Sequence, residues 1–177
     1  MGTAPHVLPS ILHVGVCAVI CGTAAGTKSR VLTAYYADPS SRFWGVLHRV
    51  GLTKDRLKPD DFRTLPKFGL GLTDIAKTVS GADAKLPPGA FNVPAFMESI
   101  RRCRPKIVAF NGKAAARAFY GITSQKRLDY RPGFPVPDFP HIFILLSTSG
   151  SAGRYWDLAW WQEFARRVAV ERFGTIQ

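Results

Sequence analysis

Apolar stretches of strand length alternate along this chain with amphipathic stretches of helix length. The pattern predicts strands at residues 14–21, 70–75, 106–110 and 141–147, each of which ends in small or polar residues. It predicts helices at residues 41–50, 60–65, 93–103, 113–120 and 154–173. Strands and helices that alternate in this way are typical of an α/β domain with a largely parallel sheet.

Two Pro/Gly-rich segments, residues 80–88 and 131–140, are predicted to be surface loops. In an open parallel sheet, ligands bind at the carboxyl ends of the strands, where the connecting loops gather. The segments in which we expect a functional site are therefore residues 22–36, 73–77, 111–113 and 147–154.

The composition narrows the class of partner. A length of 177 residues fits a single domain over residues 1–177, and 46% hydrophobic with 12% aromatic residues exclude a disordered basic tail. The 24 Lys and Arg residues against 12 Asp and Glu residues give a net charge of +12. Such a surface attracts polyanions, so nucleic acid is the leading partner class.

The cysteines and the apolar runs of the chain predict neither a metal site nor a membrane span. Three cysteines are too few for a disulfide framework or a four-cysteine metal site, so we expect no metal and no other cofactor. The longest apolar run, residues 14–21, is shorter than the roughly 20 residues that a membrane span needs. Residues 1–13 lack the pattern of a signal peptide, so a soluble, cytoplasmic protein is predicted.

The first candidate loop, Gly-Thr-Ala-Ala-Gly-Thr-Lys-Ser at residues 22–29, resembles a phosphate-binding P-loop with one departure. Thr27 occupies the position of the second glycine, and residues 31–35 do not predict a helix whose N-terminus could hold a phosphate. A degenerate nucleotide hydrolase and a plain strand-to-loop turn both remain open on this evidence.

The next block, Asp-Pro-Ser-Ser-Arg-Phe-Trp at residues 38–44, resembles the His-Pro-x-Asn-Arg-Phe-Trp segment of the mismatch-specific uracil/thymine DNA glycosylases. These enzymes belong to the uracil-DNA glycosylase superfamily. The resemblance continues in register through residues 22–26, 71–75, 109–113 and 147–154, and covers about residues 14 to 164. It implies a three-layer α/β/α sandwich around a central, mainly parallel sheet of four or five strands.

The resemblance also implies an activity: such enzymes flip uracil out of DNA and hydrolyse its N-glycosidic bond, which leaves an abasic site for base-excision repair. They work as monomers. By resemblance, the main-chain N–H groups of Thr23 and Tyr36 hold the uracil carbonyl oxygens, and the Tyr36 ring stacks on the base. Gly22, Ala24 and Asn111 also fall in the base-binding segments. From residue type alone, Tyr36 is equally a core aromatic, and Asn111 is equally a helix cap.

The chain departs from the family where the chemistry is done. Ala24 stands in place of the catalytic Asn that positions water, so Asp74 is the best candidate for that role. Asp74 could instead read the base, if it keeps a proton, or form an Asx turn. Ser147 stands where relatives have Asn or His and can donate one hydrogen bond to the base. Asp38 replaces the family's His, and an Asp-Pro turn is the favoured interpretation.

The remaining candidates are DNA contacts. The tip Ser149-Gly150-Ser151 falls where the family inserts a wedge, and its small polar residues favour bases that leave the duplex easily. Plausible phosphate contacts are Lys28, Ser29, Arg42, Lys113 and Arg154. Because Ala24 cannot orient water, a uracil- or abasic-site-binding protein with weak or lost catalysis is the second hypothesis.

Overall fold

The computed structural model describes residues 5–123, 128–153 and 156–174. Its strands are β1 (Ala18–Ala25), β2 (Leu70–Ser80), β3 (Ile107–Asn111), β4 (Arg131–Pro132) and β5 (His141–Leu145). They form a five-stranded sheet in the order β2-β1-β3-β5-β4. The first four strands in this order are parallel, and β4 is antiparallel to β5. The predicted mainly parallel sheet is therefore confirmed.

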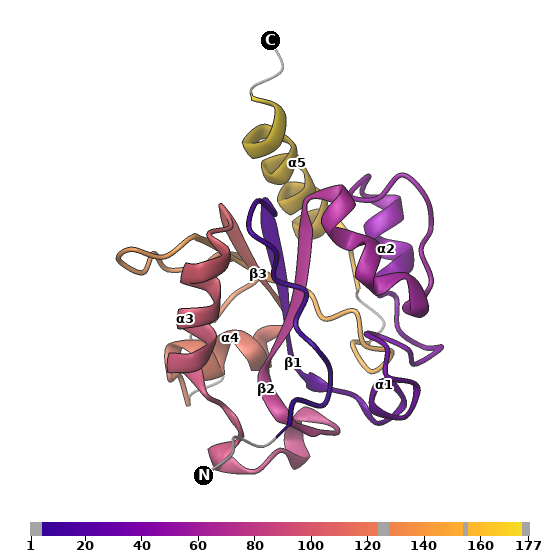
Figure 1. The fold of residues 1–177 in the computed structure, drawn as a ribbon, viewed down its shortest axis with the longest axis vertical. Coiled ribbons are helices and arrows are strands. Elements are labelled where there is room, and N and C mark those ends of the chain that lie inside the picture. Colours follow the sequence, from indigo (N-terminus) through magenta and orange to yellow (C-terminus); the bar gives the residue numbers. More distant parts are fainter. Residues whose placement is uncertain (1–4, 124–127, 154–155, 175–177) are drawn as a thin grey trace.

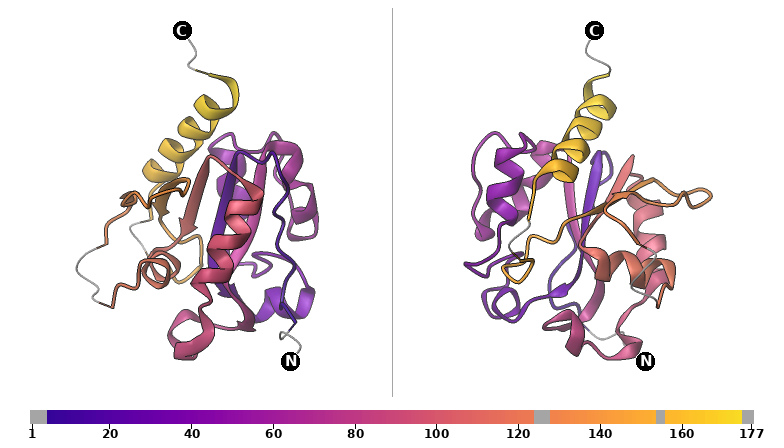
Figure 2. Two further views of the ribbon diagram at one scale, coloured as in Figure 1. Left: turned by 60° about the vertical axis from the view of Figure 1, so that its left-hand side comes forward. Right: turned by 180° about the vertical axis from the view of Figure 1, so that it is seen from behind.

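Helices cover both faces of the sheet (Figures 1 and 2). The α-helices are α1 (Thr27–Leu32), α2 (Phe43–Arg49), α3 (Val93–Cys103), α4 (Lys113–Tyr120) and α5 (Ala159–Phe173). The 3₁₀ helices are η1 (Pro59–Phe68), η2 (Asp83–Lys85) and η3 (Pro88–Ala90). One hydrophobic cluster joins the sheet to α2, η1 and α5, and a second joins it to α3 and α4. This arrangement is the predicted three-layer α/β/α sandwich.

The alternation of side chains along the strands divides the core between the two faces. On β1, Ala18 and Ile20 pack into the first cluster, whereas Val19 and Cys21 pack into the second. All four are fully buried, as expected for a central parallel strand covered on both faces.

The strands differ from the predicted ranges at their ends. β1 begins at Ala18 rather than at residue 14, because Gly15 has a positive φ of 96° in a turn and Val14 is 79% exposed. β2 continues to Ser80, beyond the predicted end at residue 75. β5 ends at Leu145, before the predicted end at residue 147.

The helix predictions are correct for α3 and α4 and partly wrong elsewhere. The predicted helix at residues 60–65 is the 3₁₀ helix η1, which contains Pro66, a residue without the N–H that an α-helix needs. The last helix begins at Ala159 rather than at residue 154. α1 was not predicted, and the predicted loops at residues 80–88 and 131–140 contain η2 and β4.

Candidate active site

The centre of the site is formed where β1 and β2 lie side by side. Gly22 on β1 pairs with Asp74 on β2, and Asp74 is 4% exposed. A Cβ atom on Gly22 would lie 2.5 Å from Asp74 Oδ1, so only glycine leaves room for this carboxylate. Asp74 therefore lies within a strand, and the predictions that it ends a strand or forms an Asx turn are wrong.

The surroundings of Asp74 suit a group that accepts a proton near neutral pH. Burial raises the pKa of Asp74 to about 6, the positive charge of Lys77 opposes this shift, and the negative charge of Asp83 adds to it. Within the described residues, no hydrogen bond reaches the Asp74 carboxylate. At pH 7 the carboxylate is thus mostly ionised and unengaged, as a general base must be.

Substitution of Gly22 tests this packing. In Gly22→Ala, the added methyl group must displace the Asp74 carboxylate. We expect the single-turnover rate of the reaction at this site to fall about tenfold, because the carboxylate is misplaced. Gly26→Ala is the matched control, since a Cβ atom there meets nothing within 4 Å. Equal rates in the two variants would contradict the close approach of Gly22 and Asp74.

Tyr36 is held beside this centre with an uncommon backbone. Its φ is 53°, and its ring stacks on Phe43 with ring centroids 3.8 Å apart and an interplanar angle of 19°. The hydroxyl is buried and has no hydrogen bond of good geometry among the described residues. Burial and then the Asp74 charge raise its pKa, and the facing Asn111 side chain opposes this. The partly buried ring both packs against the core and reaches the site.

Asn111 joins β3 to the segment that follows β5. Its Nδ2 donates to Thr148 Oγ1 at 2.8 Å, and its Oδ1 accepts from the Thr148 main-chain N–H at 3.0 Å. The predicted alternative of a helix cap is wrong, because α4 begins after Gly112 without a side-chain cap. Asn111 is buried in this joint with its side chain toward Tyr36.

Ser147 lies apart from Asp74 along the sheet. It follows β5, which is separated from β2 by β1 and β3, and its Oγ accepts from the Ser149 main-chain N–H at 3.3 Å. A Cβ atom on Gly112 would lie 3.2 Å from Ser147 Cβ, so Ser147 sits beside the start of α4. The structure brings together Gly22, Asp74, Tyr36 and Asn111, and leaves Ser147 at the margin.

The tip Ser149-Gly150-Ser151 is folded onto the protein. Gly150 packs directly against the Ser40 side chain, and Arg42 Nη1 donates to the Ser149 carbonyl oxygen at 3.0 Å. The Ser149 and Ser151 hydroxyls lie 3.0 Å apart. The tip is therefore a turn that is held by its neighbours, with only small side chains to offer.

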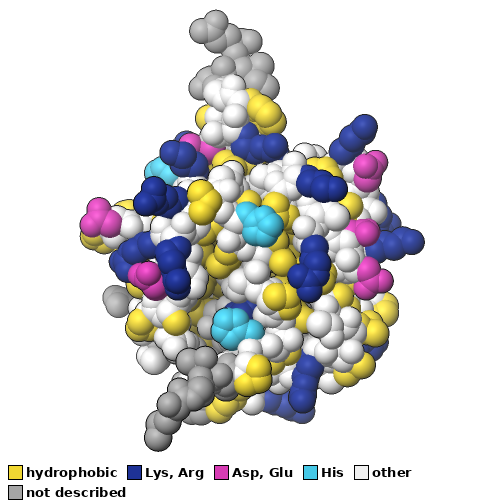
Figure 3. Space-filling view, in the orientation of Figure 1, with side chains coloured by type: hydrophobic (Ala, Val, Ile, Leu, Met, Phe, Trp, Pro, Cys, Tyr) yellow, Lys and Arg dark blue, Asp and Glu magenta, His cyan; other side chains and the backbone are white. Residues whose placement is uncertain are grey.

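The predicted phosphate contacts fall into different settings. Lys28 Nζ lies 3.6 Å from Asp38 Oδ2 at the surface, Arg42 contacts the tip, and Lys113 Nζ lies 4.3 Å from the centroid of the Tyr130 ring. Arg154 lies outside the described residues. On the face in Figure 3, Lys and Arg side chains gather at the upper left and along the right-hand side.

Ser29 differs from its prediction. It is buried, and its Oγ accepts from the Ala37 main-chain N–H at 3.2 Å, so it braces the turn after α1 instead of facing a phosphate. The same burial argues against a P-loop, in which this hydroxyl would face a metal ion. The Asp-Pro turn is confirmed, because Asp38 Oδ1 accepts from the Ser40 main-chain N–H at 2.9 Å.

Two charged residues, Lys77 and Asp83, act on the pKa of Asp74. Lys77 lies in the predicted segment 73–77 but was given no role, and Asp83 was not predicted. The pairing of β1 with β2 shifts after Ala24, so that Ala25 pairs with Ser80. The Gly81 main-chain N–H donates to the Ala25 carbonyl oxygen at 2.9 Å, and this brings η2 back to the site. There burial raises the pKa of Asp83, and the nearby Thr23 side chain opposes this shift. Lys77, on the shifted part of β2, donates to Tyr35 Oη at 3.1 Å.

Within residues 5–123, 128–153 and 156–174, no three His, Cys, Asp or Glu side chains gather as metal ligands would. None of the helices in these ranges is both long and apolar enough to cross a bilayer.

Comparisons with known proteins place the chain in a family. The model of the Uracil DNA glycosylase superfamily matches residues 13–167, so the chain belongs to this superfamily. Its fold is similar to a solution structure from Methanosarcina acetivorans described as "a putative Uracil DNA glycosylase", with a TM-score of 0.64 and 19% sequence identity. The match covers 91% of this chain and 96% of that one. Membership indicates a uracil-DNA glycosylase-like hydrolase that acts on DNA.

Proposed function

We propose that this protein is a monofunctional uracil-DNA glycosylase. It flips uracil out of DNA and hydrolyses the N-glycosidic bond, which leaves an abasic site for base-excision repair, and it acts as a monomer. The observation that carries the proposal is the Asp74 carboxylate, which is buried beside Gly22 with a pKa of about 6 and no hydrogen bond within the described residues.

Asp74 takes over the orientation of the attacking water, which the methyl side chain of Ala24 cannot perform. As the glycosidic bond breaks, positive charge develops on the sugar, and an ionised carboxylate stabilises this charge while it orients the attacking water. The alternative, in which a protonated Asp74 reads the base, is disfavoured at pH 7 because the pKa lies about one unit lower. The structure thus supports the water-activating role.

Tyr36 binds the departing base through its main-chain N–H and its ring. Its main-chain N–H makes no hydrogen bond among the described residues, so it is available to a uracil carbonyl oxygen. The base leaves as an anion, and fixed main-chain donors stabilise such charge without reorganising. One face of the Tyr36 ring rests on Phe43, which leaves the opposite face for the flipped base.

The likeness to the mismatch-specific uracil/thymine DNA glycosylases rests on the block Arg42-Phe43-Trp44. Each of these three residues contacts another part of the site. Arg42 holds the tip, Phe43 supports the Tyr36 ring, and Trp44 Nε1 donates to the Tyr35 carbonyl oxygen at 3.1 Å. The block thereby fixes the backbone that leads into Tyr36. We therefore propose that the chain is closest to this family, with an atypical first motif.

A single-turnover assay tests the proposal. Excess protein is incubated with labelled oligonucleotides that carry uracil in a single strand, opposite guanine or opposite adenine, and abasic sites are cleaved by alkali. We expect cleavage at the uracil, and a thymine-guanine duplex tests whether thymine is also removed. Binding to uracil-containing DNA without alkali-labile product would overturn the enzyme proposal. It would favour the binding-protein hypothesis, which Ala24 supports.

A further inference from the structure

Two large apolar side chains are exposed at the end of α1. Val31 is 75% and Leu32 is 60% exposed, and they are adjacent in the sequence. Among the described residues, the other exposed large apolar side chains, Val14, Phe134 and Phe173, are widely separated along the chain. A contiguous exposed apolar pair beside a functional site marks a contact surface more often than an isolated residue does.

The position of α1 places this pair on the rim of the site. α1 follows β1 directly, and Tyr36 comes four residues after Leu32. Lys28 on α1 pairs with Asp38, and the Ser40 hydroxyl donates to Asp38 Oδ1 at 2.7 Å.

Ser40 in turn packs against Gly150, so these contacts connect α1 to the tip Ser149-Gly150-Ser151. This chain of contacts ties the helix that carries the exposed pair to the tip.

The tip itself cannot fill the space that a flipped base leaves. Its largest side chains are the hydroxymethyl groups of Ser149 and Ser151, and Arg42 and Ser40 hold it down. The exposed apolar groups at this rim belong to Val31 and Leu32.

We propose that Val31 and Leu32 form an apolar wedge that contacts the DNA bases beside the target nucleotide. The exposed cations Lys28 and Arg30 precede the pair on the same helix and favour a polyanion over an apolar protein partner. Apolar side chains that insert between bases hold the stack open, so the wedge assists flipping from a duplex. This inference rests on the proposed function.

The test compares wild type with Val31→Ser/Leu32→Ser on two substrates. We expect single-turnover excision from a uracil-adenine duplex to fall about tenfold, whereas excision from a single strand changes less than about threefold, because no stack must be opened there. A 2-aminopurine base next to the uracil should also lose its fluorescence increase on binding. Both variant residues are exposed, so the fold is expected to persist, and a circular dichroism melt checks this.

Val14→Ser is the matched control, because Val14 is 79% exposed and precedes the opposite end of β1. It should behave as wild type on both substrates. An unchanged duplex rate in the double variant, or an equal loss on both substrates, would overturn the wedge. The proposed function fails separately, if wild type excises uracil from neither substrate.

Discussion

Asp74→Ala and Asp74→Asn are each expected to lower the single-turnover rate of uracil excision by about 10²- to 10⁴-fold. The carboxylate is buried beside Gly22 and free of hydrogen bonds within the described residues, so its charge is directed at whatever enters the site. Alanine removes both the water-binding group and the charge. Asparagine keeps a polar group of similar size but neither stabilises a positive sugar nor accepts a proton.

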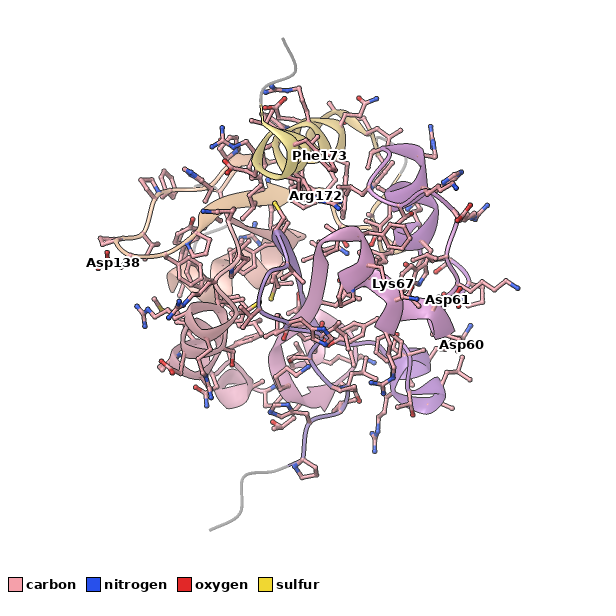
Figure 4. All side chains as sticks on the ribbon, turned by 45° about the horizontal axis from the view of Figure 1, so that its top comes forward. Asp60, Asp61, Lys67, Asp138, Arg172 and Phe173 are labelled. Atoms are coloured by element: carbon pink, nitrogen blue, oxygen red, sulfur yellow. The ribbon has the colours of Figure 1, made fainter. Side chains whose placement is uncertain are left out.

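Asp138→Asn is the matched control for these variants. Asp138 lies on the loop before β5, far from β2, and Figure 4 shows it at the left edge of the molecule. Its φ of 55° is a conformation that asparagine adopts readily, so the rate should stay at the wild-type value. Near-wild-type excision by Asp74→Asn would show that the charge is dispensable and would contradict the proposed role.

Much of the fold could be predicted because capping residues in the sequence mark where several helices begin and end. α3 begins where Asn92 Oδ1 accepts from the Ala95 main-chain N–H at 3.1 Å, and α4 ends at Gly121 with a φ of 65°. Both signals are local. The start of β1 could not be predicted, because residues 14–17 are as apolar as a strand although they form a turn.

Part of the candidate site could likewise be predicted from the sequence, and part could not. Asp74 and Gly22 could be located because each lies in or directly after a strand-like apolar segment, and the α/β pattern brings the carboxyl ends of such segments to one edge of the sheet. The effect of Lys77 and Asp83 on Asp74 could not be predicted, because it depends on a shift in strand pairing after Ala24.

The joint between Asn111 and Thr148 spans 37 residues of sequence, so no local pattern reveals it. Likewise, the burial of Ser29 follows from its bond to Ala37 after α1, a short helix that the pattern did not show.

The rate should also depend on pH through the same carboxylate. In the proposed mechanism Asp74 acts in its ionised form, and its pKa is about 6, so excision should fall about tenfold for each pH unit below 6 and level off above it. Asp83→Asn removes a like charge and should move this acid limb to lower pH. Lys77→Met removes an opposite charge and should move it to higher pH. Shifts in the same direction would contradict the assignment of the limb to Asp74.

The stability of the protein reports the same titration without any substrate. The pKa of Asp74 rises from 3.8 to about 6 on folding, so the folded state holds the proton more tightly than the unfolded state. Stability from this group is complete below pH 3.8 and is lost as the pH rises through 6, at a cost of roughly 3 kcal/mol. Urea unfolding should therefore find Asp74→Asn more stable than wild type at pH 7.5 and similar at pH 4. A variant of equal stability at both pH values would show that the carboxylate is solvated rather than buried, and the acid limb of the rate would then need another source.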